Sequence, residues 1–311
     1  MEIKHINKQF DIREDIIATI GEFDGMHLAH QKLIEKCISL SKEYKCKSAL
    51  ICFYPHPDYV LKKRENKGYL NTLDEKIEII KAYNFDYLYI MEFTEDLLKE
   101  SKEEFYDHYL SKLKGLVIGY DFRFAYHGSG DKDYLKDKFK DKIFAVIDQQ
   151  SFIEEDGKLE KISSNSIRKY LDDGKIEKAN ELLSYHYSFK GRVEKGKGIG
   201  RKMGYPTANV DIDDEKYIPK LGVYACLIAI DDKKYQGICN LGVNPSIDNL
   251  NKARLEVNIF DFDDDIYDKN IKIELIHFLR EEIKFKEYQE LVNEIKKDEE
   301  IIKSYFRGIY E

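Results

Sequence analysis

The 311-residue sequence has no long apolar run: no stretch approaches the ~18 consecutive apolar residues that cross a membrane. Its first residues, Met1 to His5, also lack the apolar core of a secretory signal. The five cysteines are odd in number and form no Cys-x-x-Cys pair, which argues against a disulfide scaffold or a zinc ribbon. We therefore expect a soluble cytoplasmic protein with reduced thiols and no membrane partner.

The sequence also lacks the basic excess of a duplex-DNA binder. Lysine plus arginine number 51 against 59 for aspartate plus glutamate, a formal net charge of −8. We expect no nucleic-acid partner. Phosphorylated small molecules stay open as ligands, because a few cations and helix N-termini can hold them. Hydrophobic residues at 42% suffice for a core, and the length suits about two domains.

The first half alternates short β-branched or aromatic runs with longer segments of helical period. The runs predict buried parallel strands at 16–20, 48–53, 87–91, 116–118 and 144–147. The segments between them predict helices at 31–44, 74–83 and 95–113. This alternation indicates an α/β domain with a parallel sheet, whose ligands lie outside the carboxyl ends of the strands.

The pattern changes near residues 184–190, so we expect one domain at 1–184 and a second at 185–311. Helices are predicted at 165–171, 176–183 and 286–306, the last amphipathic. Short alternating segments predict antiparallel strands at 189–193, 223–230, 235–241, 254–260 and 271–276, with acidic hairpin turns at 231–232 and 263–265. Such strands suggest a small antiparallel β-barrel.

A glycine-containing loop follows the first predicted strand. Gly21 and Gly25 allow a tight turn and a close approach of the backbone to a ligand. The N-terminus of the next helix is a natural anion site. His27 and His30 are three residues apart on its first turn, so both imidazoles could donate to one phosphate. Two surface histidines or a metal pair are the alternatives, and the position between strand and helix favours the phosphate.

Three more loops follow later strands or open a helix. Two prolines flank His56 in Phe53–Pro57 and make that loop rigid. The segment Gly119–Phe124 combines aromatic rings with a cation and a carboxylate. Hydroxyls in Ser163–Arg168 can cap a helix, while its guanidinium can meet an anion. Each loop alone could equally be structural: a proline turn, a buried aromatic pair or a capped helix.

Together, these motifs resemble the adenylyltransferase half of bacterial bifunctional riboflavin kinase/FAD synthetases. The order and spacing match for Gly-x-Phe-Asp-Gly-x-His-x-x-His, Tyr-Pro-His-Pro, Gly-Tyr-Asp-Phe-Arg-Phe and Ser-Ser-x-x-Ile-Arg. The resemblance implies a nucleotidyltransferase-like domain that adenylylates FMN to FAD with ATP. It implies triphosphate contacts from His27, His30, Ser164 and Arg168, flavin and adenine contacts from Phe53, His56, Pro57 and Asp121, and nucleotide contacts from Gly21, Phe23, Asp24, Gly25 and Ser163. Two positions depart from the family pattern, Ala29 for a glycine and Asn165 for a threonine.

The second half carries a near-match to a P-loop at 191–197. We reject it, because Gly198 stands where a serine or threonine must meet magnesium and no helical pattern follows. Thr207 and Asn209, two apart, would emerge on one face of an extended segment, and their oxygens suit Mg²⁺ shared with nucleotide phosphates. Alternation from Arg254 predicts that Glu256 faces outward, which by itself indicates an ordinary solvated carboxylate.

Further motifs resemble the riboflavin kinase half of the same enzymes. They are Gly204–Asn209, the strand start at 222–224, Asn240–Ser246, Leu255–Val257 and Phe278–Phe285. The resemblance implies that Thr207 and Asn209 hold Mg-ATP and that Glu256 activates the 5′-hydroxyl of riboflavin. Gly196, Gly204, Pro206 and Arg280 are expected in the same site. Asn258 stands where a histidine is common.

The chain is therefore expected to be a bifunctional transferase that makes FMN and then FAD from riboflavin and ATP. These small molecules are its expected partners, and the oligomeric state stays open. Two alternatives remain. One is a riboflavin kinase whose first domain is weakened or re-purposed, given Ala29 and Asn165. The other is a non-catalytic flavin or nucleotide sensor, for which a residue such as Glu256 would be unnecessary.

Overall fold

The computed structural model describes residues 1–6, 10, 12–60, 68–154, 156–196, 200, 204–244, 252–285 and 287–310. The chain forms two compact units, Met1–Ser164 and Asn165–Glu311. Pro245 and Ser246 of the kinase motif, and Lys197 and Gly198 of the near P-loop, lie outside the described residues.

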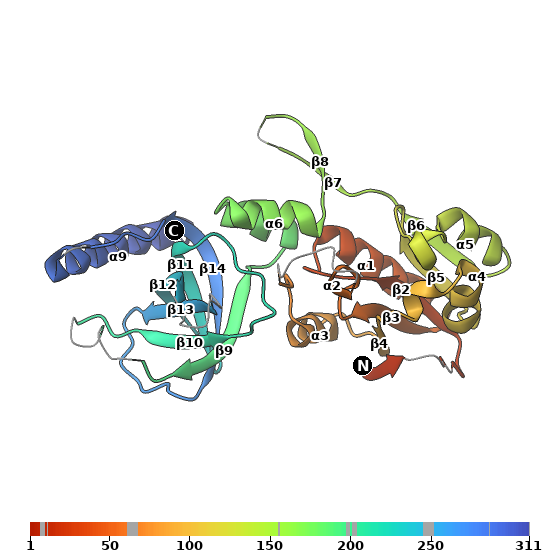
Figure 1. Ribbon diagram of the computed structural model, residues 1–311, viewed down its shortest axis with the longest axis horizontal. Coiled ribbons are helices and arrows are strands. Elements are labelled where there is room, and N and C mark those ends of the chain that lie inside the picture. Colours follow the sequence, from red (N-terminus) through yellow and green to blue (C-terminus); the bar gives the residue numbers. More distant parts are fainter. Residues whose placement is uncertain are drawn as a thin grey trace. The chain divides into compact units, whose positions relative to one another are not determined.

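A six-stranded parallel sheet forms the centre of the first unit (Figure 1). Its strands lie in the order β1-β4-β3-β2-β5-β6. Their bounds are β1 (Glu2–Ile6), β2 (Ile16–Gly21), β3 (Lys47–Tyr54), β4 (Tyr87–Glu92), β5 (Gly115–Gly119) and β6 (Ile143–Ile147). All five predicted strands are confirmed. Strand β1 was not predicted, because it lies at the edge of the sheet beside β4 and exposes Lys4 and His5 instead of forming an apolar run.

The helical segments of the first unit lie between these strands. They are α1 (Leu28–Glu43), α2 (Pro57–Val60), α3 (Leu73–Lys81), the 3₁₀ turn η1 (Leu97–Lys99), α4 (Lys102–Phe105), the π-helical η2 (Tyr106–Leu110), the 3₁₀ turn η3 (Tyr126–Gly128) and α5 (Lys132–Lys138). The predicted single helix at 95–113 is wrong. The chain becomes extended at Glu100, and Ser101 then starts α4 through a capping box with Glu104.

A two-stranded hairpin, β7 (Ser151–Ile153) with β8 (Leu159–Lys161), completes the first unit. It stands away from the six-stranded sheet in Figure 1. Neither strand was predicted from the sequence, because both are three residues long and Ile153 and Leu159 are exposed. The hairpin leads the chain back to Ser163 and Ser164.

The second unit contains the predicted antiparallel barrel, which is closed and has the strand order β10-β13-β12-β11-β14-β9. Its strands are β9 (Ser188–Glu194), β10 (Ala208–Ile212), β11 (Gly222–Ile230), β12 (Lys233–Asn244), β13 (Lys252–Ile259) and β14 (Asn270–Arg280). Asp231 adopts a positive φ of 52° in the predicted hairpin turn between β11 and β12. The second hairpin prediction, at 263–265, is wrong: β13 and β14 are not neighbours, so this acidic segment crosses between separated strands.

Three helices complete the second unit: α6 (Ser164–Asp172), α7 (Ile176–Leu183) and α9 (Tyr288–Tyr310). All three were predicted. The Asn180 amide of α7 donates to the Leu275 carbonyl of β14 at 2.9 Å. From α9, Ile302 and Phe306 pack into an apolar cluster with barrel residues such as Val223. The α6 and α7 helices thus belong to the barrel unit, apart from Ser164 itself.

Candidate functional site

The order of the parallel sheet brings the predicted loops of the first unit together. Strands β3, β2 and β5 are neighbours, and all three run in the same direction. Gly21, Tyr54 and Gly119, at their carboxyl ends, therefore lie along one edge of the sheet. This is the edge at which open α/β sheets bind ligands.

The loop after β2 has an unusual backbone. Phe23 (φ 49°), Gly25 (φ 83°) and Met26 (φ 43°) all lie in the left-handed region. Two of them are not glycines, and each such residue stores of the order of 1 kcal/mol or more of strain. Such strain persists only where neighbouring groups hold the turn, and it is concentrated at functional sites.

Side chains from three other segments hold the carbonyl groups of this loop. Lys76 Nζ donates to the Glu22 carbonyl at 2.8 Å, Ser164 Oγ to the Asp24 carbonyl at 2.8 Å, and Gln31 Nε2 to the Met26 carbonyl at 2.9 Å. The turn is thereby fixed by bonds along its length. Ser164, predicted as a phosphate ligand, thus lies at the loop and braces it.

Two residues predicted to contact nucleotide are buried within the loop. The Asp24 carboxylate is 1% exposed and accepts the backbone N–H of Leu70 at 2.9 Å. Phe23 is fully buried, and its ring lies 5.1 Å from that of His30. Both side chains are therefore buried and support the conformation of the loop from the protein interior.

His27 and His30 form a stacked pair at the start of α1. Their ring centroids are 3.6 Å apart with planes 15° from parallel. His27 is the N-cap of the helix, and its Nδ1 accepts the backbone N–H of His30 at 3.4 Å. Nδ1 of His30 is buried and has no hydrogen-bond partner among the described residues. The helix begins at Leu28, three residues before the predicted start, because the histidine itself supplies the cap.

Burial keeps both imidazoles neutral at pH 7. Burial lowers the pKa of His27 from 6.5 to about 4, against the opposing effect of Asp24. The pKa of His30 is lowered well below its usual range by burial, by repulsion from the protonated form of His27, and by the charges of Lys76 and Lys161. Since His27 Nδ1 already accepts a bond, its Nε2 carries the proton and can donate to an anion.

We expect the first unit to lose stability as the pH falls from 6.5 towards 4. Both histidines have lowered pKa values in the folded state, so the unfolded chain binds protons first and acid favours unfolding. A His27 pKa of about 4 instead of 6.5 contributes about 3 kcal/mol to this loss. Urea unfolding at pH 7 and 4.5, followed by hydrogen exchange of peptides from 1–164, measures it. His27→Asn keeps a cap acceptor and should lessen the loss; an equal loss would contradict this explanation.

The loop after β3 is tied to the same turn. His56 is 3% exposed, and its Nε2 lies 2.7 Å from Oε2 of Glu22. Its backbone N–H donates to the Tyr69 hydroxyl at 2.9 Å. Phe53 is buried in the core, and Pro57 begins α2. Of these predicted contacts, His56 therefore joins the histidine loop through Glu22, whereas Phe53 packs inward.

The remaining residues predicted for the adenylyltransferase half are Asp121 and Ser163 in the first unit and Arg168 in the second. Asp121, just past β5, forms an ion pair with Lys161 of the hairpin. Ser163 precedes α6. Arg168 belongs to the second unit, where it is 5% exposed with its guanidinium 5.2 Å from the ring centre of Tyr217.

A cavity of about 1080 Å³ on the barrel collects most of the residues predicted for the kinase half. Its lining includes Gly196, Pro206, Thr207, Asn209, Glu256 and Arg280. Gly204 does not line it, but a φ of 79° turns the chain immediately before Tyr205. Asp263, Asp264 and Asp265 of the crossing segment line it too. Residues separated by up to 105 positions in the sequence, Val193 and Asp298, thus line one cavity.

Three polar side chains lie side by side in a row on adjacent strands of the barrel, at this cavity. Glu256 on β13 is paired with Asn209 on β10 and with Asn240 on β12. Directly opposed residues in antiparallel strands point to the same face, with Cβ atoms about 5 Å apart. The neighbours Leu255 and Val257 are fully buried. The predicted outward orientation of Glu256 therefore places it beside the predicted metal ligands.

Three polar contacts fix the groups of this row. Arg254 Nη2 lies 2.8 Å from Glu256 Oε2, so one carboxylate oxygen is held by a cation. Asn258 Nδ2 donates to the Pro206 carbonyl at 2.7 Å and fixes the segment that carries Thr207. Asn240 Nδ2 donates to Glu282 at 2.9 Å.

Arg280 is engaged by a carboxylate. Its guanidinium makes hydrogen bonds of 2.6 to 3.2 Å to Asp298 on α9, which is 2% exposed. Both residues line the cavity. Arg280 therefore joins α9 to the end of β14. Any contact of Arg280 with a ligand would be made while it is paired with Asp298.

Gly196→Ala should impair the barrel site selectively. A Cβ at this position would lie 2.1 Å from Asn209 Nδ2, so the amide has to move. In the riboflavin phosphorylation that the resemblance implies, we expect the KM for ATP to rise by about tenfold or more. FAD formation from supplied FMN should not change. Gly308→Ala is the matched control, since its Cβ meets nothing within 4 Å. Wild-type kinetics in Gly196→Ala would contradict the placement of Asn209 in the site.

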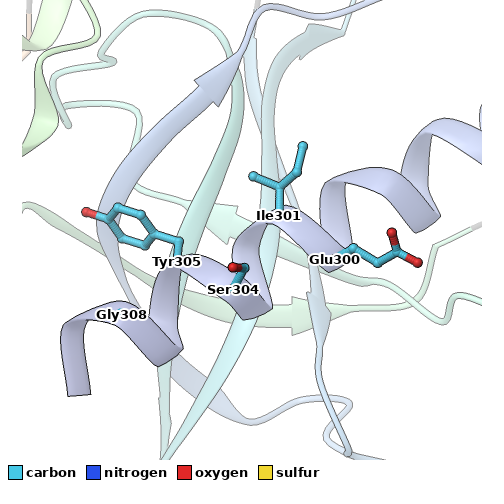
Figure 2. Close-up of a pocket in the computed structure, with 5 residues that line it drawn as sticks. All are labelled: Glu300, Ile301, Ser304, Tyr305 and Gly308. Atoms are coloured by element: carbon cyan, nitrogen blue, oxygen red, sulfur yellow. The ribbon is translucent and has the colours of Figure 1, made fainter. Parts of the chain in front are cut away.

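A second, shallow hollow lies on α9. Glu300, Ile301, Ser304, Tyr305 and Gly308 line it along one side of the helix (Figure 2). It holds none of the residues predicted for either site. Within the described ranges, no cluster of three or more histidine, cysteine or acidic side chains could hold a metal by itself.

Comparison with known proteins finds a family for each half of the chain. The family model for FAD synthetase matches residues 9–166, and that for riboflavin kinase matches residues 183–306. The bifunctional riboflavin kinase/FMN adenylyltransferase of Buchnera aphidicola subsp. Schizaphis graminum is 37% identical over 313 residues, covering 99% of both chains. That of Bacillus subtilis is 34% identical over 298 residues, covering 94% of this chain and 93% of its own. The chain belongs to the bifunctional riboflavin kinase/FMN adenylyltransferase family.

One solved structure matches this family member along nearly its full length. Its title is that of a macrolide-efflux protein from Streptococcus pneumoniae; the TM-score is 0.87 at 29% identity, covering 97% of this chain and 98% of that one. The two chains therefore share a fold. Within the part of the chain that the structure describes, no helix is both long and apolar enough to span a membrane.

Several side chains that fix the two sites were not predicted from the sequence. Lys76 lies in a helix that reads as an ordinary charged surface helix, and nothing in the pattern marks its burial. Arg254 was expected only to face outward, although its spacing of two from Glu256 on one strand could have suggested the ion pair. Asn240 stood in a matched motif without a role, which only the register of β12 with β13 supplies.

Proposed function

We propose that this enzyme phosphorylates riboflavin to FMN at the barrel cavity and adenylylates FMN to FAD at the histidine loop. We assign adenylyl transfer to residues 1–184 and phosphorylation to residues 185–311. The observation that carries the proposal is the difference between the sites. The barrel cavity holds a carboxylate beside hydroxyl and amide oxygens, whereas the loop offers neutral imidazoles at a helix N-terminus.

The kinase half needs a proton acceptor. The nucleophile is the 5′-hydroxyl of riboflavin, whose proton must leave as its oxygen bonds to the γ-phosphorus of ATP and the bond from that phosphorus to ADP breaks. We propose that Glu256 accepts it, with Arg254 holding one carboxylate oxygen and leaving the other for the hydroxyl. Thr207 and Asn209 are proposed to bind the Mg²⁺ that accompanies ATP, since oxygen ligands suit this ion and the phosphates supply the rest.

The adenylyltransferase half needs no base. The nucleophile is the phosphate of FMN, which is already an anion at neutral pH. An FMN oxygen bonds to the α-phosphorus of ATP, and the bond to pyrophosphate breaks. What the site must supply is compensation of negative charge, which His27, His30 and the N-terminus of α1 can provide. Ser164 and Arg168 are proposed to contribute to the same task.

The proposed ligand contacts of the other predicted residues follow the same division. His56, Pro57 and Asp121 are proposed to border flavin and adenine at the sheet edge. Phe53, which packs into the core and is 7% exposed, is proposed to reach the ligand only with that exposed part.

The four cysteines that are buried, Cys37, Cys52, Cys226 and Cys239, are all free thiols, as is Cys46. They support a reducing compartment, and we propose that the enzyme acts in the cytoplasm on small molecules, without a nucleic-acid partner.

One incubation tests this proposal. The pure protein is mixed with riboflavin and Mg-ATP, and the products are separated by chromatography over time. FMN that appears first and is then converted to FAD, with pyrophosphate released, is the expected result. FMN alone would indicate a riboflavin kinase without adenylyltransferase activity. This is the second candidate function, because Ala29 and Asn165 depart from the family pattern. If neither FMN nor FAD forms, the proposal is refuted.

A further inference from the structure

The first unit buries a lysine beside the histidine loop. Lys76 on α3 is 2% exposed, and its Nζ donates to the carbonyl of Glu22 at 2.8 Å. None of the described carboxylates forms an ion pair with it. Burying an ammonium group without a counter-ion is costly, so lysines are rarely fully buried unless they are paired. The lysine therefore calls for an explanation other than stability.

The position of Lys76 connects it to the proposed phosphate site. The carbonyl that it binds leads into the strained turn at Phe23, Gly25 and Met26. Its positive charge also contributes to the lowered pKa of His30, after burial and repulsion from the protonated form of His27. The ammonium thus fixes the entry of the turn and adds positive potential at the imidazoles.

Nearby carboxylates are engaged elsewhere. The carboxylate of Glu22 lies against His56 at 2.7 Å, and that of Asp24 accepts the Leu70 N–H. At the same place, Nδ1 of His30 is buried without a hydrogen-bond partner among the described residues. A cation without a counter-ion beside an unsatisfied imidazole indicates a site that is completed by a multiply charged anion.

We propose that Lys76 is a positioning residue of the adenylyl-transfer site. Its buried charge attracts the triphosphate of ATP and the pyrophosphate that leaves, and its bond to Glu22 holds the turn that cradles them. This inference rests on the adenylyltransferase activity proposed above. It needs no contact between ammonium and phosphate, because a fixed charge in buried surroundings acts over several ångströms. The reaction is unchanged: an FMN oxygen bonds to the α-phosphorus and pyrophosphate departs.

Two substitutions separate charge from position. Lys76→Met removes both the charge and the donor, whereas Lys76→Gln removes the charge but keeps an N–H for the Glu22 carbonyl. We expect both substitutions to raise the KM for ATP in FAD formation from FMN by about tenfold or more. The pyrophosphate concentration that halves the rate of FAD formation should rise by a similar factor. Both should also raise the pKa of His30 measured by NMR, because a neighbouring positive charge is gone.

Controls use the same chain. Lys81→Met, an exposed position on the same helix, should match the wild type. Riboflavin phosphorylation by each preparation should be unchanged and serves as the standard for active protein. Wild-type behaviour of Lys76→Gln would overturn the role of the charge, and wild-type behaviour of Lys76→Met would overturn the inference altogether. A wild-type enzyme that makes no FAD from FMN would instead refute the proposed function.

Discussion

Glu256→Gln should abolish FMN formation from riboflavin while FAD formation from supplied FMN continues at the wild-type rate. Glutamine keeps the size and the polar contacts of the side chain but cannot accept a proton. Loss of a positioned general base typically costs about 10²–10⁴-fold in rate. Because the substituted group acts on the hydroxyl and not on ATP, we expect the loss in kcat and little change in the KM for ATP. Chromatography of FMN under initial-rate conditions measures it.

The control for this substitution is Glu181→Gln. Glu181 lies on α7 of the same unit and is exposed. It should leave both reactions unchanged. If Glu256→Gln retained more than about a tenth of the wild-type rate, a general base would not be needed there. The bond from Arg254 would then be the main purpose of the carboxylate.

His27→Ala should produce the opposite pattern. FAD formation from FMN should fall by about 10²-fold or more, because a donor aimed at the developing charge is removed. Riboflavin phosphorylation should persist. The side chain also caps α1, so part of the effect could come from the helix start. His27→Asn separates the two roles, since asparagine is a good N-cap but has no imidazole donor.

A catalytic role for the imidazole requires both variants to lose FAD formation. Recovery of the wild-type rate in His27→Asn would show that only the helix cap matters. His5→Ala, at an exposed position on β1, is the neutral control. Radiolabelled pyrophosphate exchange into ATP with FAD present gives an independent measure of the same step in the reverse direction.

The parts of the fold with a clear hydrophobic period could be predicted from sequence. Strand β3, with six buried residues in succession, and strand β11, nearly buried throughout, read directly as sheet interior. Edge elements could not, because β1 and the β7–β8 hairpin expose the residues that would mark them. The break at Ser101 was also missed: a capping box competes locally with helix continuation, and the helical period runs across it.

The candidate residues were identifiable by motif, but their neighbours were not. Asn209, Glu256 and Asn240 become one row only through the register of β13 with β12, which precedes it in the chain, and with β10, which is two strands further away in the sequence. Lys76 meets Glu22 across 54 positions, a separation that no local pattern reports. Residues far apart in sequence that act on one turn can be found only once the sheet order is known.

The central claim is that one chain carries two separate ATP sites with different chemistry, and mixing two inactive variants tests it most directly. Neither Glu256→Gln nor His27→Ala should convert riboflavin to FAD alone, whereas an equimolar mixture of both should do so, with FMN detectable in solution as the intermediate. A mixture that stays inactive, although each variant still performs its remaining reaction, would contradict two sites that work independently.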